Sequence, residues 1–283
     1  MGAPYRNLTG KSPLVKQNIQ SVVITGASAG LGRALALQYA IRERSLGLLG
    51  RDKERLGEVA DACRACGAEV TIGAFDLLEA KAVSTWMRAF DVAHPIDLLI
   101  VNAGVFTGHG ADRAMETDDE IMAMLRINLE SATTTIAAAL PMLRTRRRGR
   151  IAIVGSLAAL QPLADAPAYS ASKAGLMSYG EALREWLIPD GVGVTLIYPG
   201  HIATNQVSNH VGALPLIMSA DAAAARIKRG LDRGRAFIAF PLALIVADTG
   251  GTAVALAGKS GAGGEHAVPC GQGIARCSES KRS

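Results

Sequence analysis

Tyr169 and Lys173 stand four residues apart in a segment of helical periodicity, a spacing that places both side chains on one face of a helix. An isolated phenol has a pKa of about 10 and is a poor base at neutral pH, but a nearby ammonium favours the phenolate and lowers that pKa. The pair therefore predicts a tyrosine that can exchange protons. Taken alone, a tyrosine and a lysine at this spacing more often belong to an ordinary amphipathic surface.

A second group of residues could bind an anion, the run Thr25-Gly26-Ala27-Ser28-Ala29-Gly30-Leu31-Gly32. It follows an apolar segment typical of a strand and leads into a segment typical of a helix. Glycines let backbone amides approach a pyrophosphate, and the helix N-terminus adds unpaired N–H groups and the positive end of its dipole. The run therefore predicts a phosphate-binding turn. The alternative is a glycine-rich turn without a ligand.

Short β-branched apolar runs alternate with longer segments of helical period, which is typical of repeated βαβ units. Apolar strands of this kind suit a sheet covered on both faces, and right-handed crossovers then give an α/β, Rossmann-type doubly wound parallel sheet in a single domain. Ligands of such sheets bind beyond the carboxyl ends of the strands. The predicted strands are 21–25, 45–50, 69–74, 97–102, 150–155, 193–198 and 236–240, and the predicted helices are 30–42, 52–66, 79–93, 118–143, 168–187 and 220–233.

The spacing of the glycines, GxxxGxG, resembles the cofactor loop of the short-chain dehydrogenases/reductases. Asn102-Ala103-Gly104 after the fourth predicted strand, and Tyr169 with Lys173 after the fifth, match further motifs of that family in the same order. The resemblance covers roughly residues 20–204. It implies a nicotinamide dinucleotide in the crevice of the sheet and an oxidoreductase that acts on CH–OH groups.

The resemblance also implies which residues bind the cofactor. Asp76 is expected beside the adenine. It could also cap the following helix, and the two roles are compatible. The segment after Pro199 is expected to approach the nicotinamide, with Thr204 bonding its carboxamide, whereas His201 is expected to contact substrate or solvent rather than to catalyse. The implied cofactor-binding residues are Gly26, Ser28, Ala29, Gly30, Leu31, Gly32, Arg51, Asp76, Leu77, Asn102, Ala103, Gly104, Tyr169, Lys173, Pro199, Gly200, Ile202 and Thr204.

The end of the second predicted strand distinguishes NADP(H) from NAD(H). An acid there binds the ribose 2′-hydroxyl, whereas a basic residue favours the 2′-phosphate. Gly50 occupies the family's usual acid position and Arg51 its usual basic one, so NADP(H) is favoured. NAD(H) stays possible because a loop shifted by one residue would aim the carboxylate of Asp52 at the ribose.

A catalytic tetrad of Asn128, Ser156, Tyr169 and Lys173 is implied by the same resemblance. Ser156 precedes Tyr169 by the separation usual in the family and would hydrogen-bond the substrate oxygen on which charge develops. Asn128 is expected to keep a water near the lysine for a proton relay. Gly155 departs from the family pattern, which often has a second serine at that position.

These residues predict an NADP(H)-dependent enzyme that interconverts a carbonyl and an alcohol by hydride transfer, with Tyr169 as acid and base. Residues 105–110, 157–167 and 201–218 are expected to shape the substrate site, and their apolar character suggests a hydrophobic ketone or alcohol. The alternatives are a non-catalytic NADP-binding regulatory or scaffold protein and an epimerase or dehydratase on the same fold. The family implies a homodimer or homotetramer formed through the long helices 118–143 and 168–187.

Composition sets further limits. The chain has 283 residues, 49% of them hydrophobic, and a net charge of +5. The catalytic domain is expected over 20–249, after a polar N-terminal extension at 1–19 and before a poorly ordered Gly/Ala/Ser-rich tail at 250–283. No nucleic-acid partner is expected, because the densest basic stretch lacks interleaved aromatic residues and is interpreted as a solvated face. That stretch consists of Arg144, Arg146, Arg147, Arg148 and Arg150.

Four cysteines are too few for a disulfide scaffold, and the N-terminal stretch lacks an apolar export signal, so a cytoplasmic location is predicted. No metal is expected, because Cys63 and Cys66 lie in a predicted helix and the group Cys270, Cys277 and His266 matches no familiar zinc spacing. The segment 241–247 is apolar but too short to span a bilayer. Residues 236–247 are predicted to form a final strand and a packing segment, with an interfacial membrane anchor as the alternative.

Overall fold

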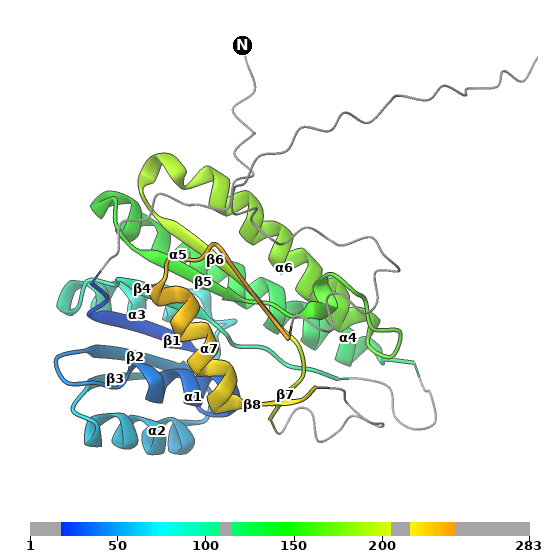
Figure 1. Cartoon of the computed structure of the whole chain (residues 1–283), viewed down its shortest axis with the longest axis horizontal. Helices are drawn as coiled ribbons and strands as arrows, with labels where there is room; N and C mark the ends of the chain where they lie inside the picture. The colour runs from blue at the N-terminus through cyan, green and yellow to red at the C-terminus, as the bar shows by residue number, and fades with distance from the viewer. Residues whose placement is uncertain (1–17, 108–114, 205–215, 242–283) are drawn as a thin grey trace, which may run out of the picture.

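The computed structural model describes residues 18–107, 115–204 and 216–241, and seven strands in these ranges form one sheet (Figure 1). The strand order is β3-β2-β1-β4-β5-β6-β9, and each neighbouring pair is parallel. This is the predicted Rossmann-type doubly wound sheet. The strands are β1 (Ser21–Thr25), β2 (Ser45–Gly50), β3 (Glu69–Ala74), β4 (Leu98–Val101), β5 (Arg150–Val154), β6 (Gly193–Pro199) and β9 (Phe237–Phe240).

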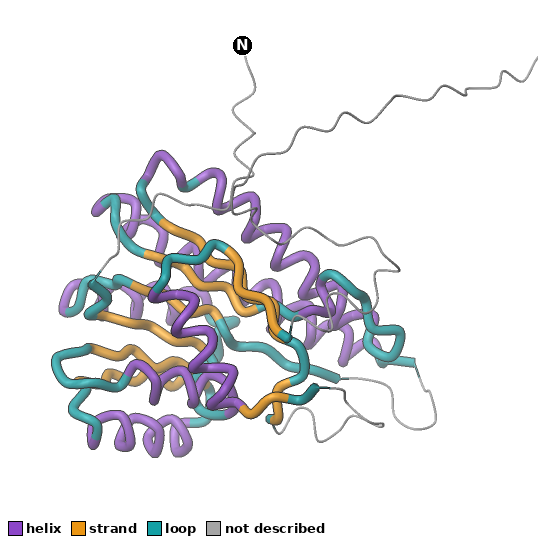
Figure 2. Tube along the Cα trace, in the orientation of Figure 1, coloured by secondary structure: helices purple, strands orange, loops and turns teal. Residues whose placement is uncertain are grey.

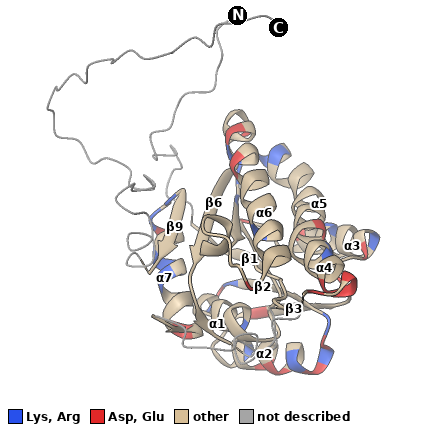
Figure 3. Ribbon diagram, turned by 90° about the vertical axis from the view of Figure 1, so that its right-hand side faces the viewer, with Lys and Arg blue, Asp and Glu red and all other residues tan. Residues whose placement is uncertain are grey.

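Helices cover both faces of the sheet (Figures 2 and 3). One core packs α1, α2 and α7 against side chains such as Val22 and Ile24, and the other packs α3, α5 and α6 against the intervening Val23. Alternate residues of one strand thus enter opposite cores. The helices are α1 (Gly30–Tyr39), α2 (Lys53–Ala65), α3 (Ala80–Ala93), α4 (Asp118–Leu125), α5 (Ser131–Arg146), α6 (Pro167–Trp186) and α7 (Ala220–Asp232).

The centre of the sheet is fully buried, which explains the unbroken apolar character of its strands. Ile24 of β1 pairs with Leu48 of β2 on one side and with Ile100 of β4 on the other, and none of the three is exposed. The chain crosses from one side of β1 to the other between β3 and β4. Parallel sheets bind ligands at such a switch point, beyond the carboxyl ends of the strands.

The single helix predicted over 118–143 is wrong in detail. It consists of α4, one π-helical turn at Arg126–Glu130, and α5, which continues to Arg146 and ends where Arg147 adopts a left-handed conformation. A π-helical turn accommodates an extra residue and is frequent at functional sites. A short ladder of β7 (Ile202–Ala203) and β8 (Met218–Ser219) was not predicted, because two-residue strands leave no periodicity in a sequence.

The basic stretch is not simply a solvated face. Arg146 forms a bidentate ion pair with Asp91, with N–O distances of 2.6 and 2.8 Å, and Arg148 pairs with Asp97 at 2.9 Å. The Arg150 side chain is buried and donates to the carbonyl of Leu231. These arginines bind the end of α5 and the start of β5 to neighbouring elements. The prediction that the whole stretch is a solvated face is therefore wrong for Arg146, Arg148 and Arg150.

In the part of the chain that the structure describes, no helix is long and apolar enough to cross a membrane, and no group of His, Cys, Asp and Glu could hold a metal ion. Cys63 is a buried free thiol and Cys66 an exposed one. Several predictions lie outside the described residues: most of the N-terminal extension, the segment 242–247, the tail at 250–283, the group Cys270, Cys277 and His266, and much of the predicted substrate loops.

Candidate functional site

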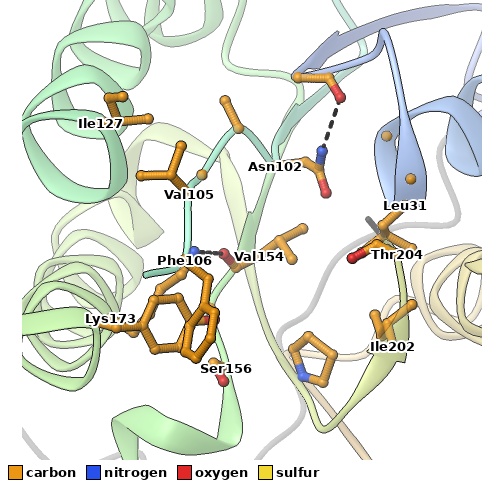
Figure 4. A pocket seen from close by; sticks show the side chains of 18 of the residues that line it. Leu31, Asn102, Val105, Phe106, Ile127, Val154, Ser156, Lys173, Ile202 and Thr204 are labelled. Atoms are coloured by element: carbon orange, nitrogen blue, oxygen red, sulfur yellow. Dashed lines mark hydrogen bonds between the residues drawn. The ribbon is translucent and has the colours of Figure 1, made fainter. Parts of the chain in front are cut away.

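A cleft of about 1090 Å³ opens at the carboxyl ends of the strands. Figure 4 shows Phe106, Ser156 and Lys173 on one side of it, and Leu31, Ile202 and Thr204 on the other. The cleft is lined by every predicted cofactor-binding residue and by Ser156, Tyr169 and Lys173 of the predicted tetrad. The sequence motifs therefore converge in space, although they come from segments far apart in the chain.

The glycine turn is fixed to the end of β4 by Thr25. Its hydroxyl accepts hydrogen bonds from the backbone amides of Asn102 and Ala103 at 2.9 and 3.0 Å, and the Asn102 side chain donates to the Thr25 carbonyl at 3.0 Å. A Cβ at Gly32 would collide with the carbonyl of Gly26 and lie 2.7 Å from the Asn102 amide nitrogen. Glycine is therefore required where α1 begins, and the two motifs form one rigid floor of the cleft.

Asn128 lies in the π-helical turn and is fully buried behind the cleft rather than in its lining. Its side-chain oxygen accepts from the amide of Val105 at 2.7 Å, and its amide nitrogen donates to the Val105 carbonyl at 2.9 Å and to the Ser172 hydroxyl at 3.1 Å. Ser172 in turn donates to the carbonyl of Tyr169 at 2.7 Å. Asn128 thus connects the segment after β4 to the helix that carries the tyrosine.

Lys173 is 4% exposed, and its ammonium donates to the Val154 carbonyl at 3.3 Å (Figure 4). Burial lowers the pKa of Lys173 to about 8, because a low-dielectric site disfavours the charged form. The nitrogen lies 5.8 Å from the centre of the Tyr169 ring. The amine therefore stands over the phenol ring, as the four-residue spacing predicts.

The electrostatics of Tyr169 differ from the expectation. Burial raises the pKa of its phenol, and the group that opposes this is Ser156, whose hydrogen bond lowers the pKa. The spacing of Tyr169 and Lys173 had instead predicted that the lysine lowers this pKa. Desolvation outweighs this hydrogen bond. Part of the surrounding wall is Phe106, whose ring packs edge-on against Tyr169 with centroids 5.0 Å apart.

Gly155 replaces the second serine of the family pattern because Met177 of α6 fills the space. A Cβ at Gly155 would fall inside the contact distance of the Met177 sulfur and lie 2.8 Å from its Cγ.

Gly155→Ser should therefore lower the free energy of unfolding by about 1–3 kcal/mol. The double variant Gly155→Ser, Met177→Ala should lose less than the sum of the single variants, because the cavity accepts the serine. Urea unfolding of all four proteins measures this coupling, and additive losses would contradict the steric account.

Arg51, Asp52 and Arg55 surround the far end of the cleft, at the end of β2. Asp52 caps α2: its carboxylate accepts from the Arg55 amide at 3.0 Å and lies 3.3 Å from the Arg55 side-chain Nε. The Asp52 carboxylate therefore already has its hydrogen-bond partners within its own turn.

Asp76 also lines the cleft, and its carboxylate accepts from the Leu78 amide at 3.0 Å. The helix α3 begins only after Glu79, which occupies the N-cap position. The prediction that Asp76 could cap this helix is therefore wrong.

Four residues of the lining were not predicted from the sequence: Arg55, Ile127, Ser131 and Val154, the last of which was expected only as part of a strand. Arg55 had a visible signal, because it stands four residues after Arg51 at the start of a predicted helix. Ile127 and Ser131 had none, because their direction depends on the π-helical turn. His201 does line the cleft, and its backbone carbonyl accepts from the Met218 amide at 3.0 Å.

Fold and site together define an α/β oxidoreductase that uses a nicotinamide dinucleotide. The family model described as short chain dehydrogenase matches residues 20–212. The chain belongs to the short-chain dehydrogenase/reductase family.

Two relatives and one solved structure illustrate the family. An uncharacterised oxidoreductase of Myxococcus xanthus is 35% identical over 82% of this chain and 92% of its own. A 3-dehydrosphinganine reductase of Arabidopsis thaliana is 35% identical over 75% of this chain, which spans only 64% of that relative. A short-chain dehydrogenase of Sphingobium yanoikuyae in complex with NADPH superposes with a TM-score of 0.72 at 28% identity, covering 79% of this chain and 89% of its own.

Proposed function

We propose that this protein is an NADP(H)-dependent reductase that interconverts a ketone and a secondary alcohol, with Tyr169 as the acid and base. The observation that carries the proposal is the grouping of Ser156, Tyr169 and Lys173 on one wall of a cleft whose opposite end holds two arginines. When bound, the nicotinamide supplies or accepts the hydride. The glycine floor fits such a group, because Gly26, Gly30 and Gly32 line the cleft without side chains, which lets the backbone approach a pyrophosphate.

The protein's own residues supply the proton chemistry. In the direction of reduction, the Tyr169 phenol donates its proton to the substrate oxygen as the hydride adds to the carbonyl carbon, which leaves the alcohol and a phenolate. The Ser156 hydroxyl orients that oxygen and hydrogen-bonds the phenol, which lowers the pKa of Tyr169. The Lys173 ammonium, held by the Val154 carbonyl, offsets the phenolate charge until the proton is replaced.

An apolar carbonyl compound fits the part of the cleft next to Tyr169. Phe106, Ile127, Leu157 and Leu163 line the cleft on this side. Apart from Lys173 and His201, its acidic and basic lining residues belong to the segments after β2 and β3, and they are Arg51, Asp52, Arg55 and Asp76. One relative is named as a 3-dehydrosphinganine reductase, which supports the direction of reduction. We therefore infer a ketone with an apolar substituent as the substrate class.

NADP(H) is the proposed cofactor because Arg51 and Arg55 both face the cleft, while Asp52, the residue that left NAD(H) open, is bound to Arg55. Arg51→Ala and Arg55→Ala should each lower kcat/KM for NADPH by about tenfold, the effect of losing one charge-assisted contact to a phosphate, and leave kcat/KM for NADH unchanged. Lys53→Ala is the matched control, since Lys53 is exposed on the same helix but outside the lining. Equal losses with both cofactors would contradict the assignment.

The test of the function is the near-ultraviolet absorbance of NADPH while the protein is mixed with a panel of ketones. Apolar ketones should be reduced with consumption of one NADPH per alcohol formed. An epimerase or dehydratase would convert a substrate without net consumption, and a regulatory NADP-binding protein would bind NADPH without turnover with any of them. Either outcome would overturn the proposal.

A further inference from the structure

The helix that carries Tyr169 has no cap of its own. Ala166 occupies the N-cap position of α6, and its side chain cannot accept a hydrogen bond. Pro167 has no N–H, and the Ser170 amide bonds the Ala166 carbonyl at 3.0 Å. The free amides of the first turn are therefore those of Ala168 and of Tyr169 itself.

Glu116 provides the missing cap from a distant segment. Its carboxylate oxygen Oε2 accepts from the Ala168 amide at 3.0 Å, across 52 residues of sequence. Its other oxygen, Oε1, is buried and has no hydrogen-bond partner among the residues that the structure describes. A carboxylate at this end of a helix is also stabilised by the helix dipole. Glu116 therefore fixes the first turn of α6 at the residue next to Tyr169.

We propose that Glu116 is a positioning residue that holds Tyr169 in line with Ser156 and Lys173. This inference rests on the proposed function of Tyr169. The carbonyl of Tyr169 is held by Ser172, and its ring is packed against Phe106, but the backbone on its N-terminal side is held through Ala168 by Glu116. Displacing a reacting group by a fraction of an ångström reduces the rate while the cofactor still binds.

The experiment compares Glu116→Ala with Glu116→Gln, which keeps an oxygen that can accept from the Ala168 amide. Glu116→Ala should lower kcat by about tenfold with the KM for NADPH unchanged, and Glu116→Gln should restore most of the rate. The pH profile of alcohol oxidation should also move to higher pH in Glu116→Ala. A phenol displaced from Ser156 loses the hydrogen bond that lowers its pKa, and the phenolate then forms only at higher pH.

Ser219→Ala is the matched control, because Ser219 caps α7 by accepting from the Ala222 amide at 3.2 Å and does not line the cleft. Losing this cap should lower stability in a similar way and leave kcat and the pH profile unchanged. Amide hydrogen exchange should become faster at residues 168–170 in Glu116→Ala alone, a readout that does not depend on activity.

Three results would overturn the inference: wild-type kcat in Glu116→Ala, equal losses in the Ala and Gln variants, or unchanged exchange at 168–170. Failure of the proposed function is a separate outcome. It would be seen as an inactive wild-type protein, or as full turnover by Tyr169→Phe, whatever Glu116 does.

Discussion

Tyr169→Phe should reduce kcat for apolar ketones by about 10³-fold, the range expected for loss of a general acid, and leave the affinity for NADPH unchanged. The phenylalanine ring occupies the same space against Phe106, with only the hydroxyl group removed. No other phenol lies in the cleft lining to replace it among the residues that the structure describes. Steady-state rates give kcat, and a direct titration of NADPH binding gives the affinity.

Tyr179→Phe is the matched control for this experiment. Tyr179 lies on the same helix, is partly buried against the core, and has a pKa raised by burial as Tyr169 does, but it does not line the cleft. Its replacement should leave kcat unchanged. If Tyr169→Phe kept activity within a few-fold of the wild-type protein, or if both variants lost activity equally, Tyr169 would not be the acid.

The sequence was sufficient for those features that depend on local spacing. The glycine turn, Asn102-Ala103-Gly104 and the Tyr169–Lys173 pair each follow the end of one strand, and parallel strands bring their carboxyl ends to one edge. The periodicity of the helices and the burial of the central strands were visible in the same way. These features need no knowledge of partners far along the chain.

Other features depend on such partners and had no local signal. The π-helical turn places Asn128 against Val105, a contact between residues 23 apart in the sequence. The burial of Arg150 depends on the carbonyl of Leu231 at the end of α7, and the cap of α6 comes from Glu116. Gly155 had the appearance of a departure from the family pattern until the position of Met177 explained it.

The electrostatics at Tyr169 show how burial can reverse a prediction based on charge alone. The spacing of Tyr169 and Lys173 was predicted correctly, but spacing does not reveal how much water surrounds either group. Burial raises the pKa of the phenol and lowers that of the amine, so it favours the neutral form of both groups. Near neutral pH the phenol is neutral in the folded and the unfolded protein alike, and only the charged lysine lowers the stability. The cost should be measurable at the lysine.

Lys173→Met should abolish turnover and raise the thermal stability of the cofactor-free protein at pH 7. Burial lowers the pKa of Lys173 to about 8 in the folded state, below the value of about 10.4 for a free lysine, so the folded protein carries the full cost of the buried charge below pH 8. This cost disappears as the pH rises from about 8 to above 10, where the amine is neutral in both states. The difference in Tm between variant and wild type should therefore be largest near neutral pH and decline between about pH 8 and pH 10.

Lys81→Met, at an exposed position of α3, is the control and should show no such pH-dependent difference in Tm. A gain in Tm that stayed constant across this window would mean that the buried ammonium of Lys173 does not destabilise the folded protein. The electrostatic account of the site would then fail.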